Sequence, residues 1–274
     1  MNILLTGAGG FVGQQVLNSL LQTDNNISLV LRTGADLTPY KREPNIKSII
    51  SSPDIFTENQ QWWMDALQKI ELVIHVAWFA EPGKYLQSEK NLECLKGTMT
   101  LAQAAVATSV KRFVGIGTCF EYDLSGGYLT TKTPLSPSTP YAAAKASVYS
   151  TLSQWLSQEN VAFCWCRLFY LYGENEDRHR LVPYLRSKLA AGEVAELTSG
   201  KQIRDFLDVK HAGEMITRTA LSETQGAVNI CSGVPITVRQ LAEEIAAEYN
   251  RQDLLRFGVR PENLTDPPCV VGIK

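Results

Sequence analysis

Thr6-Gly7-Ala8-Gly9-Gly10-Phe11-Val12-Gly13 is the stretch of sequence that decides the fold. It follows a short apolar run at residues 2–5, and from Phe11 onward apolar residues recur with helical spacing. A glycine-rich turn between a buried strand and a helix is where doubly wound α/β proteins seat a dinucleotide. Gly7 permits the tight turn, Gly10 lets the backbone approach a pyrophosphate, and Gly13 lets the helix pack closely on the strand. The sequence therefore predicts a dinucleotide site at its start.

Apolar strands and helical segments alternate along the next 150 residues. The pattern predicts helices at residues 11–21, 62–70, 85–109 and 140–158, and strands at residues 2–5, 27–31, 45–50, 72–76, 112–116 and 161–168. Strands that are apolar throughout are typical of a parallel sheet covered on both faces. With right-handed crossovers this gives an α/β, doubly wound (Rossmann) sheet.

The rhythm breaks after Gly173, where residues 174–180 are dense in charge. We therefore expect a dinucleotide-binding domain over residues 1–171, with strand and helix returns near 203–230. A smaller substrate-binding lobe is expected over residues 172–274.

Composition excludes several classes of protein. The chain has 274 residues, a formal net charge of −2 and an isoelectric point of about 6.0, so nucleic acid is not an expected partner. Residue 1 is not followed by a basic leader and an apolar stretch, and no run approaches the roughly 18 apolar residues of a membrane span. The six cysteines have no CxxC spacing or clustered histidines. These features predict a cytoplasmic protein with reduced thiols, no membrane contact and no metal site.

The end of the second predicted strand bears on the choice of cofactor. An acidic side chain at this point would hold the ribose hydroxyls of NAD. Here the strand ends Val30-Leu31-Arg32-Thr33, and a guanidinium suits the 2′-phosphate of NADP. NADP(H) is therefore favoured and NAD(H) is the alternative. Arg32 would otherwise be an ordinary exposed cation.

Tyr141 and Lys145 stand four residues apart, on one face of a helix that Thr139 can cap and Pro140 can begin. Thr118 lies at the carboxyl end of the fifth strand, so the three side chains can converge beside a nicotinamide. A hydride that moves onto a carbonyl carbon leaves negative charge on oxygen, which needs a hydrogen-bond donor and a proton. Tyr141 would donate the proton, Thr118 would hold the oxygen, and Lys145 would lower the pKa of the phenol. The alternative is a helix that carries Tyr and Lys by chance.

The glycine turn, Thr118, the Tyr141/Lys145 pair and the segment at residues 200–206 resemble the extended short-chain dehydrogenase/reductases. More narrowly, they resemble the NAD(P)-dependent epimerases, dehydratases and reductases of nucleotide sugars. The resemblance implies a nucleotide-sugar substrate and a set of contacts. Those at the cofactor are Gly7, Gly10, Phe11, Val12, Asp54, Ile55, Ala77, Trp78, Tyr141 and Lys145, and those at the substrate are Cys119, Phe120, Arg180, Arg204 and Arg260.

Departures from this family's patterns help to choose the reaction. Dehydratases follow the Thr with an Asp-Glu pair, whereas Cys119 and Phe120 follow Thr118 here, so water elimination lacks its proton donor. The 3,5-epimerase-reductases place a Cys and a His where this chain has Phe120 and Arg180. The stretch at residues 117–123 is similar to that of reductases of 4-keto-6-deoxy-hexoses.

The expected activity is NADPH-dependent reduction of a keto group, at C4, on a nucleotide-linked deoxy-hexose. A 4-epimerase that retains NAD(P) and a non-catalytic dinucleotide sensor are the alternatives. By resemblance, helices near residues 85–108 and 140–158 would form a homodimer, although both could simply pack on the sheet. Family members generally continue past the position of Lys274, so the substrate lobe is expected to be shortened at its C-terminus.

Overall fold

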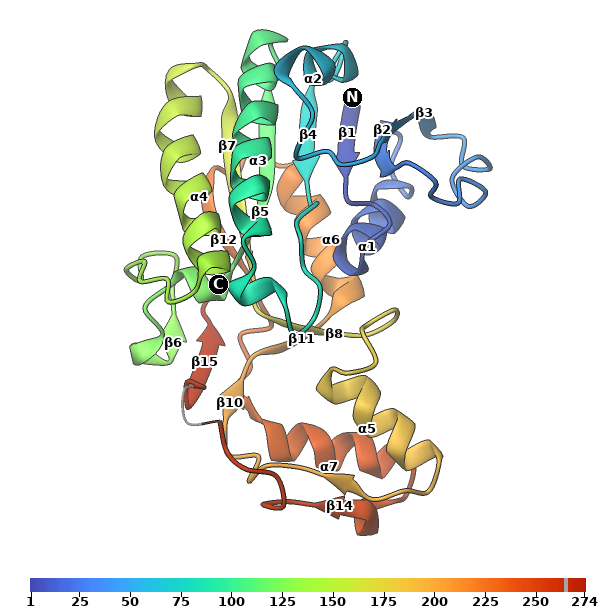
Figure 1. Ribbon diagram of the computed structural model, residues 1–274, viewed down its shortest axis with the longest axis vertical. Coiled ribbons are helices and arrows are strands. Elements are labelled where there is room, and N and C mark those ends of the chain that lie inside the picture. Colours follow the sequence, from blue (N-terminus) through green and yellow to red (C-terminus); the bar gives the residue numbers. More distant parts are fainter. Residues whose placement is uncertain (264–265) are drawn as a thin grey trace.

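The computed structural model describes residues 1–263 and 266–274, and a parallel sheet covered on both faces by helices is its largest unit (Figure 1). Within the described residues this sheet has seven strands. Their order is β12 (Gly226–Ile230), β7 (Ala162–Leu168), β5 (Arg112–Thr118), β4 (Leu72–His75), β1 (Asn2–Thr6), β2 (Asn26–Arg32) and β3 (Ile46–Ser52). Every neighbouring pair is parallel. The predicted doubly wound α/β fold is confirmed, with strand ends shifted by one or two residues.

The two faces of the sheet carry separate apolar cores. Helices α1 (Phe11–Leu20) and α6 (Val209–Ala220) cover one face, and α2 (Gln60–Ala66), α3 (Lys90–Ala107) and α4 (Pro140–Gln158) cover the other. Side chains alternate between faces along a strand, so Leu5 packs in the first core and Leu4 in the second. All of these strands end at the same edge, which is where Thr118 lies.

The helix predicted over residues 85–109 is interrupted, and that expectation was wrong. A 3₁₀ turn, η1 (Tyr85–Gln87), is followed by Ser88 in an extended conformation, and α3 begins only at Lys90. The Asn91 side chain donates to the carbonyls of Tyr85 and Ser88 at 2.6 and 2.8 Å, which holds the break in place. The interruption turns the Tyr85 ring onto that of Tyr141, with ring centroids 4.8 Å apart.

Helices α5 (Leu181–Ala190) and α7 (Val238–Glu248) form a smaller body below the large sheet (Figure 1). The short strands β9 (Ala195–Glu196) and β14 (Leu255–Arg256) pair beside them. A sheet ordered β13 (Ile236–Thr237), β10 (Ile203–Arg204), β15 (Cys269–Gly272) and β6 (Tyr128–Leu129), and the pair β8 (Tyr170–Tyr172) and β11 (Phe206–Asp208), lie between the two bodies. In the remaining described residues, 3₁₀ turns form at η2 (Cys119–Glu121), η3 (Leu124–Gly126) and η4 (Gln252–Leu254).

Asp205 ties these parts together. Its carboxylate is fully buried and accepts hydrogen bonds from the backbone N–H groups of Ser232, Gly233 and Gly272 at 2.7, 2.9 and 3.2 Å.

In the described part of the chain, no helix combines the length and the apolar character that crossing a bilayer requires.

Candidate active site

A cleft of about 1070 Å³ runs from the glycine turn, past the carboxyl ends of the strands, to the smaller body. It is lined by every residue that the sequence placed in the site except Arg260. These are Gly7, Gly10, Phe11, Val12, Arg32, Asp54, Ile55, Ala77, Trp78, Thr118, Cys119, Phe120, Tyr141, Lys145, Arg180 and Arg204.

The glycine turn has the shape that a dinucleotide pyrophosphate needs. Gly7 has a φ of +77°, a left-handed conformation that favours glycine. A Cβ added to Gly13 would lie 1.9 Å from the Gly7 carbonyl oxygen, so only glycine lets α1 approach β1 this closely. Gly10 precedes α1 and offers no side-chain cap, which leaves the N–H groups of the first turn for an anion. A dinucleotide fits this seat.

Arg32 lies at the end of β2, where it is exposed and lines the cleft. Asp36, the nearest acidic residue in sequence, accepts a hydrogen bond from the Thr38 N–H at 2.9 Å and is not among the described residues that line the cleft. The ribose end of the seat is therefore flanked by a guanidinium.

Tyr141 lies in the first turn of α4. The Thr139 hydroxyl caps this helix by accepting from the Ala142 N–H at 3.2 Å, and Pro140 occupies its first position. Burial raises the pKa of Tyr141 far above its ordinary value, electrostatic interactions with Tyr85 and Glu121 raise it further, and a hydrogen bond with Thr118 opposes the shift. The expected lowering of this pKa by Lys145 was wrong, because desolvation dominates.

The Lys145 side chain is buried near the carboxyl end of β5. Its Nζ donates to the Ile116 carbonyl at 2.6 Å and lies 3.8 Å from the centroid of the Trp78 ring. Burial lowers the pKa of Lys145 from 10.5 to about 7, while Glu121 and Cys94 act in the opposite direction. This lysine therefore titrates near neutral pH.

Thr118 ends β5, and its backbone is held from below. Its N–H donates to Glu121 Oε1 at 2.8 Å, and its hydroxyl oxygen accepts from the Phe120 N–H at 3.3 Å. The hydroxyl also forms a side-chain hydrogen bond with the Tyr141 phenol, so the two groups meet at one point of the cleft. The neighbouring Cys119 thiol is buried, which raises its pKa to about 12, so it stays protonated at neutral pH.

Aromatic rings line the part of the cleft nearest the smaller body. The Tyr170 ring lies 6.1 Å from Phe120 and 6.0 Å from Phe206, and the Arg204 guanidinium lies 5.2 Å from the Tyr170 centroid. Arg204 also forms an ion pair with Asp266, at 2.7 Å. This end has aromatic walls, and a paired arginine lies beside them.

Two other arginines differ in their position. The Arg180 guanidinium lies 5.9 Å from the Tyr85 ring centroid inside the cleft. Arg260 is exposed outside it, with its guanidinium 4.7 Å from the centroid of the Tyr184 ring. Of the three arginines expected at the substrate, Arg180 and Arg204 thus line the cleft and Arg260 does not.

Sequence reasoning missed Glu121 and Tyr85 as parts of the site. A usable signal existed for Glu121, because Thr118 and Glu121 have the Thr-x-x-Glu spacing of a capping box and form one in the structure. No local pattern marked Tyr85, since its position depends on the break at Ser88.

The family described as "NAD dependent epimerase/dehydratase family" matches residues 3–231. The chain belongs to the NAD-dependent epimerase/dehydratase family. It is therefore an oxidoreductase-type enzyme that uses a nicotinamide dinucleotide, and the resemblance inferred from the glycine turn and the Tyr141/Lys145 pair is confirmed.

Two curated relatives of this family member have names that refer to sugars attached to nucleotides. It is 28% identical to the "dTDP-6-deoxy-L-talose 4-dehydrogenase (NAD(+))" of Aggregatibacter actinomycetemcomitans over 100% of both chains. It is 24% identical to the "CDP-abequose synthase" of Salmonella muenchen, with 93% of this chain and 83% of that protein covered.

Among solved structures, the chain is similar in fold to the UDP-N-acetylglucosamine 4-epimerase of Methanobrevibacter ruminantium M1 in complex with UDP-N-acetylmuramic acid. The TM-score is 0.86 at 21% identity, and the match covers 99% of this chain and 89% of that one.

Proposed function

We propose that this enzyme transfers a hydride at C4 of a nucleotide-linked 6-deoxy-hexose, as an NADPH-dependent reduction of the 4-keto group. The convergence of Thr118, Tyr141 and Lys145 in a cleft that begins at the glycine turn carries the proposal. The full-length similarity to a dTDP-6-deoxy-L-talose 4-dehydrogenase supports both the class of sugar and the carbon.

The catalytic side chains have complementary tasks in this reaction. A bound dinucleotide would supply the hydride from its nicotinamide ring. Its pyrophosphate would be held at Gly7, Gly10 and the start of α1. Tyr141 then delivers its proton to the oxygen at C4 as negative charge develops there. The Thr118 hydroxyl would donate a hydrogen bond to the same oxygen, and Lys145 would hold the ribose of a bound dinucleotide. A phenol whose pKa is raised by burial stays protonated until the oxygen needs its proton.

The walls of the substrate end suit a deoxy-sugar. The rings of Phe120, Tyr170 and Phe206 offer apolar surface to a methyl group at C6. Arg180 and Arg204 carry the positive charge that a diphosphate requires. Arg204 would exchange its ion pair with Asp266 for the phosphate oxygens.

The preference for NADP(H) rests on Arg32, which is the first charged residue after the apolar part of β2; the acidic residue of the lining in this region, Asp54, follows the neighbouring strand β3. The name of the dTDP-6-deoxy-L-talose 4-dehydrogenase specifies NAD⁺. Both dinucleotides therefore belong in the assay.

A homodimer through α3 and α4 is also proposed. The two helices pack side by side, and Leu92 at the start of α3 is 67% exposed. Light scattering that gives the mass of one chain at micromolar concentration would contradict this dimer.

The test of function is turnover of a nucleotide-linked 4-keto-6-deoxy-hexose with NADPH and with NADH, followed by the absorbance of the reduced nicotinamide and by NMR of the sugar. A reductase consumes one reduced cofactor for each alcohol formed. A 4-epimerase would interconvert stable hexose nucleotides without net cofactor loss, and a sensor would bind the dinucleotide without turnover. Either of the last two results would refute the proposal.

A further inference from the structure

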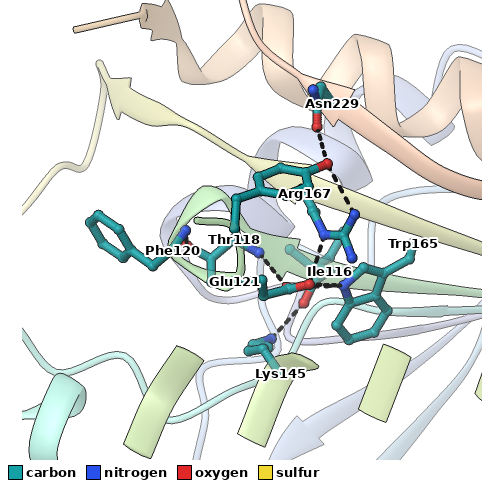
Figure 2. Close-up of polar contacts among 9 residues, drawn as sticks. Ile116, Thr118, Phe120, Glu121, Lys145, Trp165, Arg167 and Asn229 are labelled. Atoms are coloured by element: carbon teal, nitrogen blue, oxygen red, sulfur yellow. Dashed lines mark hydrogen bonds and ion pairs between the residues drawn. The ribbon is translucent and has the colours of Figure 1, made fainter. Parts of the chain in front are cut away.

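Glu121 is a carboxylate buried directly beneath the catalytic residues. None of its side chain is exposed, and it lies in η2, just after Thr118 (Figure 2). It accepts the Thr118 N–H at 2.8 Å, the indole N–H of Trp165 at 3.0 Å, and Arg167 Nε at 2.7 Å. These three donors come from β5 and the neighbouring strand β7, so Glu121 links the Thr118 backbone to the adjacent strand.

Arg167 is the counterion of Glu121, and further contacts hold its guanidinium in place. Its Nη1 donates to the Tyr122 hydroxyl at 2.9 Å, and that hydroxyl donates to the Asn229 side-chain oxygen at 2.8 Å. Its guanidinium carbon lies 4.5 and 4.3 Å from the ring centroids of Tyr122 and Tyr149. The network therefore spans β5, β7 and β12.

A buried ion pair is a poor way to stabilise a protein, because the desolvation of both charges offsets their attraction. In the described structure, Arg167 Nη2 is also buried without a hydrogen-bond partner. Apolar side chains would fill the same space at no greater cost, so a role beyond stability has to explain the pair.

We propose that Glu121, held by Arg167 and Trp165, is a positioning residue of the catalytic centre: it fixes the Thr118 backbone and places a negative charge beside the Lys145 ammonium. The inference rests on the proposed function only where its test measures rates with the sugar substrate; the binding measurements do not depend on it.

The groups that face Lys145 show why this charge matters. His75 on β4 is buried between the hydroxyls of Thr6 and Thr98, and burial lowers its pKa to about 3, so it is neutral. Burial raises the pKa of Cys94 on α3 to about 11, so this thiol is neutral as well. On α4 itself, Tyr141 is a protonated phenol. Among the described groups that act on Lys145, Glu121, in its ion pair with Arg167, is thus the one that carries a negative charge.

The test is Glu121→Gln, whose amide oxygen can still accept from Thr118 and Trp165 but carries no charge. We expect kcat to fall roughly 10- to 100-fold with KM for the sugar within about threefold. The alkaline limb of kcat/KM against pH, which reports the free enzyme, should move to lower pH by about one unit or more. The pH dependence of dinucleotide affinity should move in the same direction, and this measurement needs no sugar.

Two further variants guard the interpretation. Glu121→Gln leaves Arg167 buried and unpaired, so the double variant Glu121→Gln/Arg167→Met removes both charges and should fold with the same shifted limb. Arg112→Met is the matched control, because Arg112 is a buried arginine at the other end of β5 that donates to the carbonyls of Thr219 and Ala220. It should lower stability and leave the pH limb unchanged.

Folded Glu121 variants with the wild-type pH limb and kcat within about threefold would overturn the proposal. Failure of both Glu121 variants to fold would assign the network to folding alone, which also overturns it. If the wild-type enzyme turns over no nucleotide sugar, the proposed function fails, while a shift in the pH dependence of dinucleotide binding still supports the role of Glu121.

Discussion

Replacing Lys145 with methionine should change how the stability of the protein depends on pH. Only 3% of the lysine side chain is exposed, and its pKa falls from 10.5 to about 7 because burial disfavours the ammonium. Methionine has a similar length and no charge, so the fold should tolerate it.

The direction and size of the effect follow from proton binding. Between about pH 7 and pH 9 the unfolded chain keeps the lysine proton and the folded protein loses it. Stability therefore rises with pH through this window. The slope approaches about 1.4 kcal/mol per pH unit for one proton, or roughly 2 to 3 kcal/mol across the window. Lys145→Met removes this contribution, so its stability relative to the wild type should fall by that amount as the pH rises.

Urea denaturation followed by tryptophan fluorescence at several pH values measures both proteins. The comparison must be a difference, because the folded state raises the pKa of Cys94, Cys119 and Cys231 to about 11 or 12. Those thiols lower stability above about pH 9 in both proteins alike. A wild-type minus variant difference that stays flat, or that falls with pH, would refute the burial argument for Lys145.

Four other changes test the site. Tyr141→Phe should lower kcat about 10²- to 10⁴-fold while dinucleotide affinity measured by calorimetry stays nearly constant, and retained turnover would remove the proton-donor role. Thr118→Val should lower kcat by about 100-fold through loss of one donor to the oxygen, and an unchanged rate would show that Phe120 N–H or water suffices. Gly13→Ala should abolish dinucleotide binding and cost about 1–3 kcal/mol in urea unfolding, since its Cβ would lie 1.9 Å from the Gly7 oxygen; tight binding would contradict the packing. Arg32→Asp should shift relative affinity toward NAD⁺ by at least about tenfold, and an unaltered ratio would exclude a 2′-phosphate contact.

Local signals in the sequence were sufficient where a short segment decides its own structure. Helix α4 runs from Pro140 to Gln158 as predicted, because Thr139 and Pro140 define its start without help from distant residues. The turn between β1 and α1 was likewise predictable from local sequence, since Gly13 is required by its close approach to the Gly7 carbonyl, although Gly7 itself also packs against Ala77 beyond β4.

Features that depend on distant residues could not be predicted in this way. The break between η1 and α3 is held by Asn91, whose side-chain oxygen also accepts the Trp78 indole N–H at 2.9 Å. The pairing of Glu121 with Arg167 arises because β5 and β7 are neighbours in the sheet, although the two residues are far apart in sequence. The pKa of Tyr141 was expected in the wrong direction for the same reason: desolvation is a property of the packed cleft, and no spacing along the chain reports it.

Burial of side chains in the cleft also bears on which reaction the site favours. It keeps Tyr141 protonated, so a proton is available for the oxyanion of the proposed reaction. The same burial holds Cys119 as a thiol with a pKa of about 12, which disfavours proton abstraction beside the carbonyl. Lys145 has a pKa of about 7, and so does Glu176, which also lines the cleft, so the charges of both groups can still change near neutrality. A site that retains a donor proton and lacks an ionised base at Cys119 suits delivery of a hydride and a proton to a ketone better than elimination or double epimerisation.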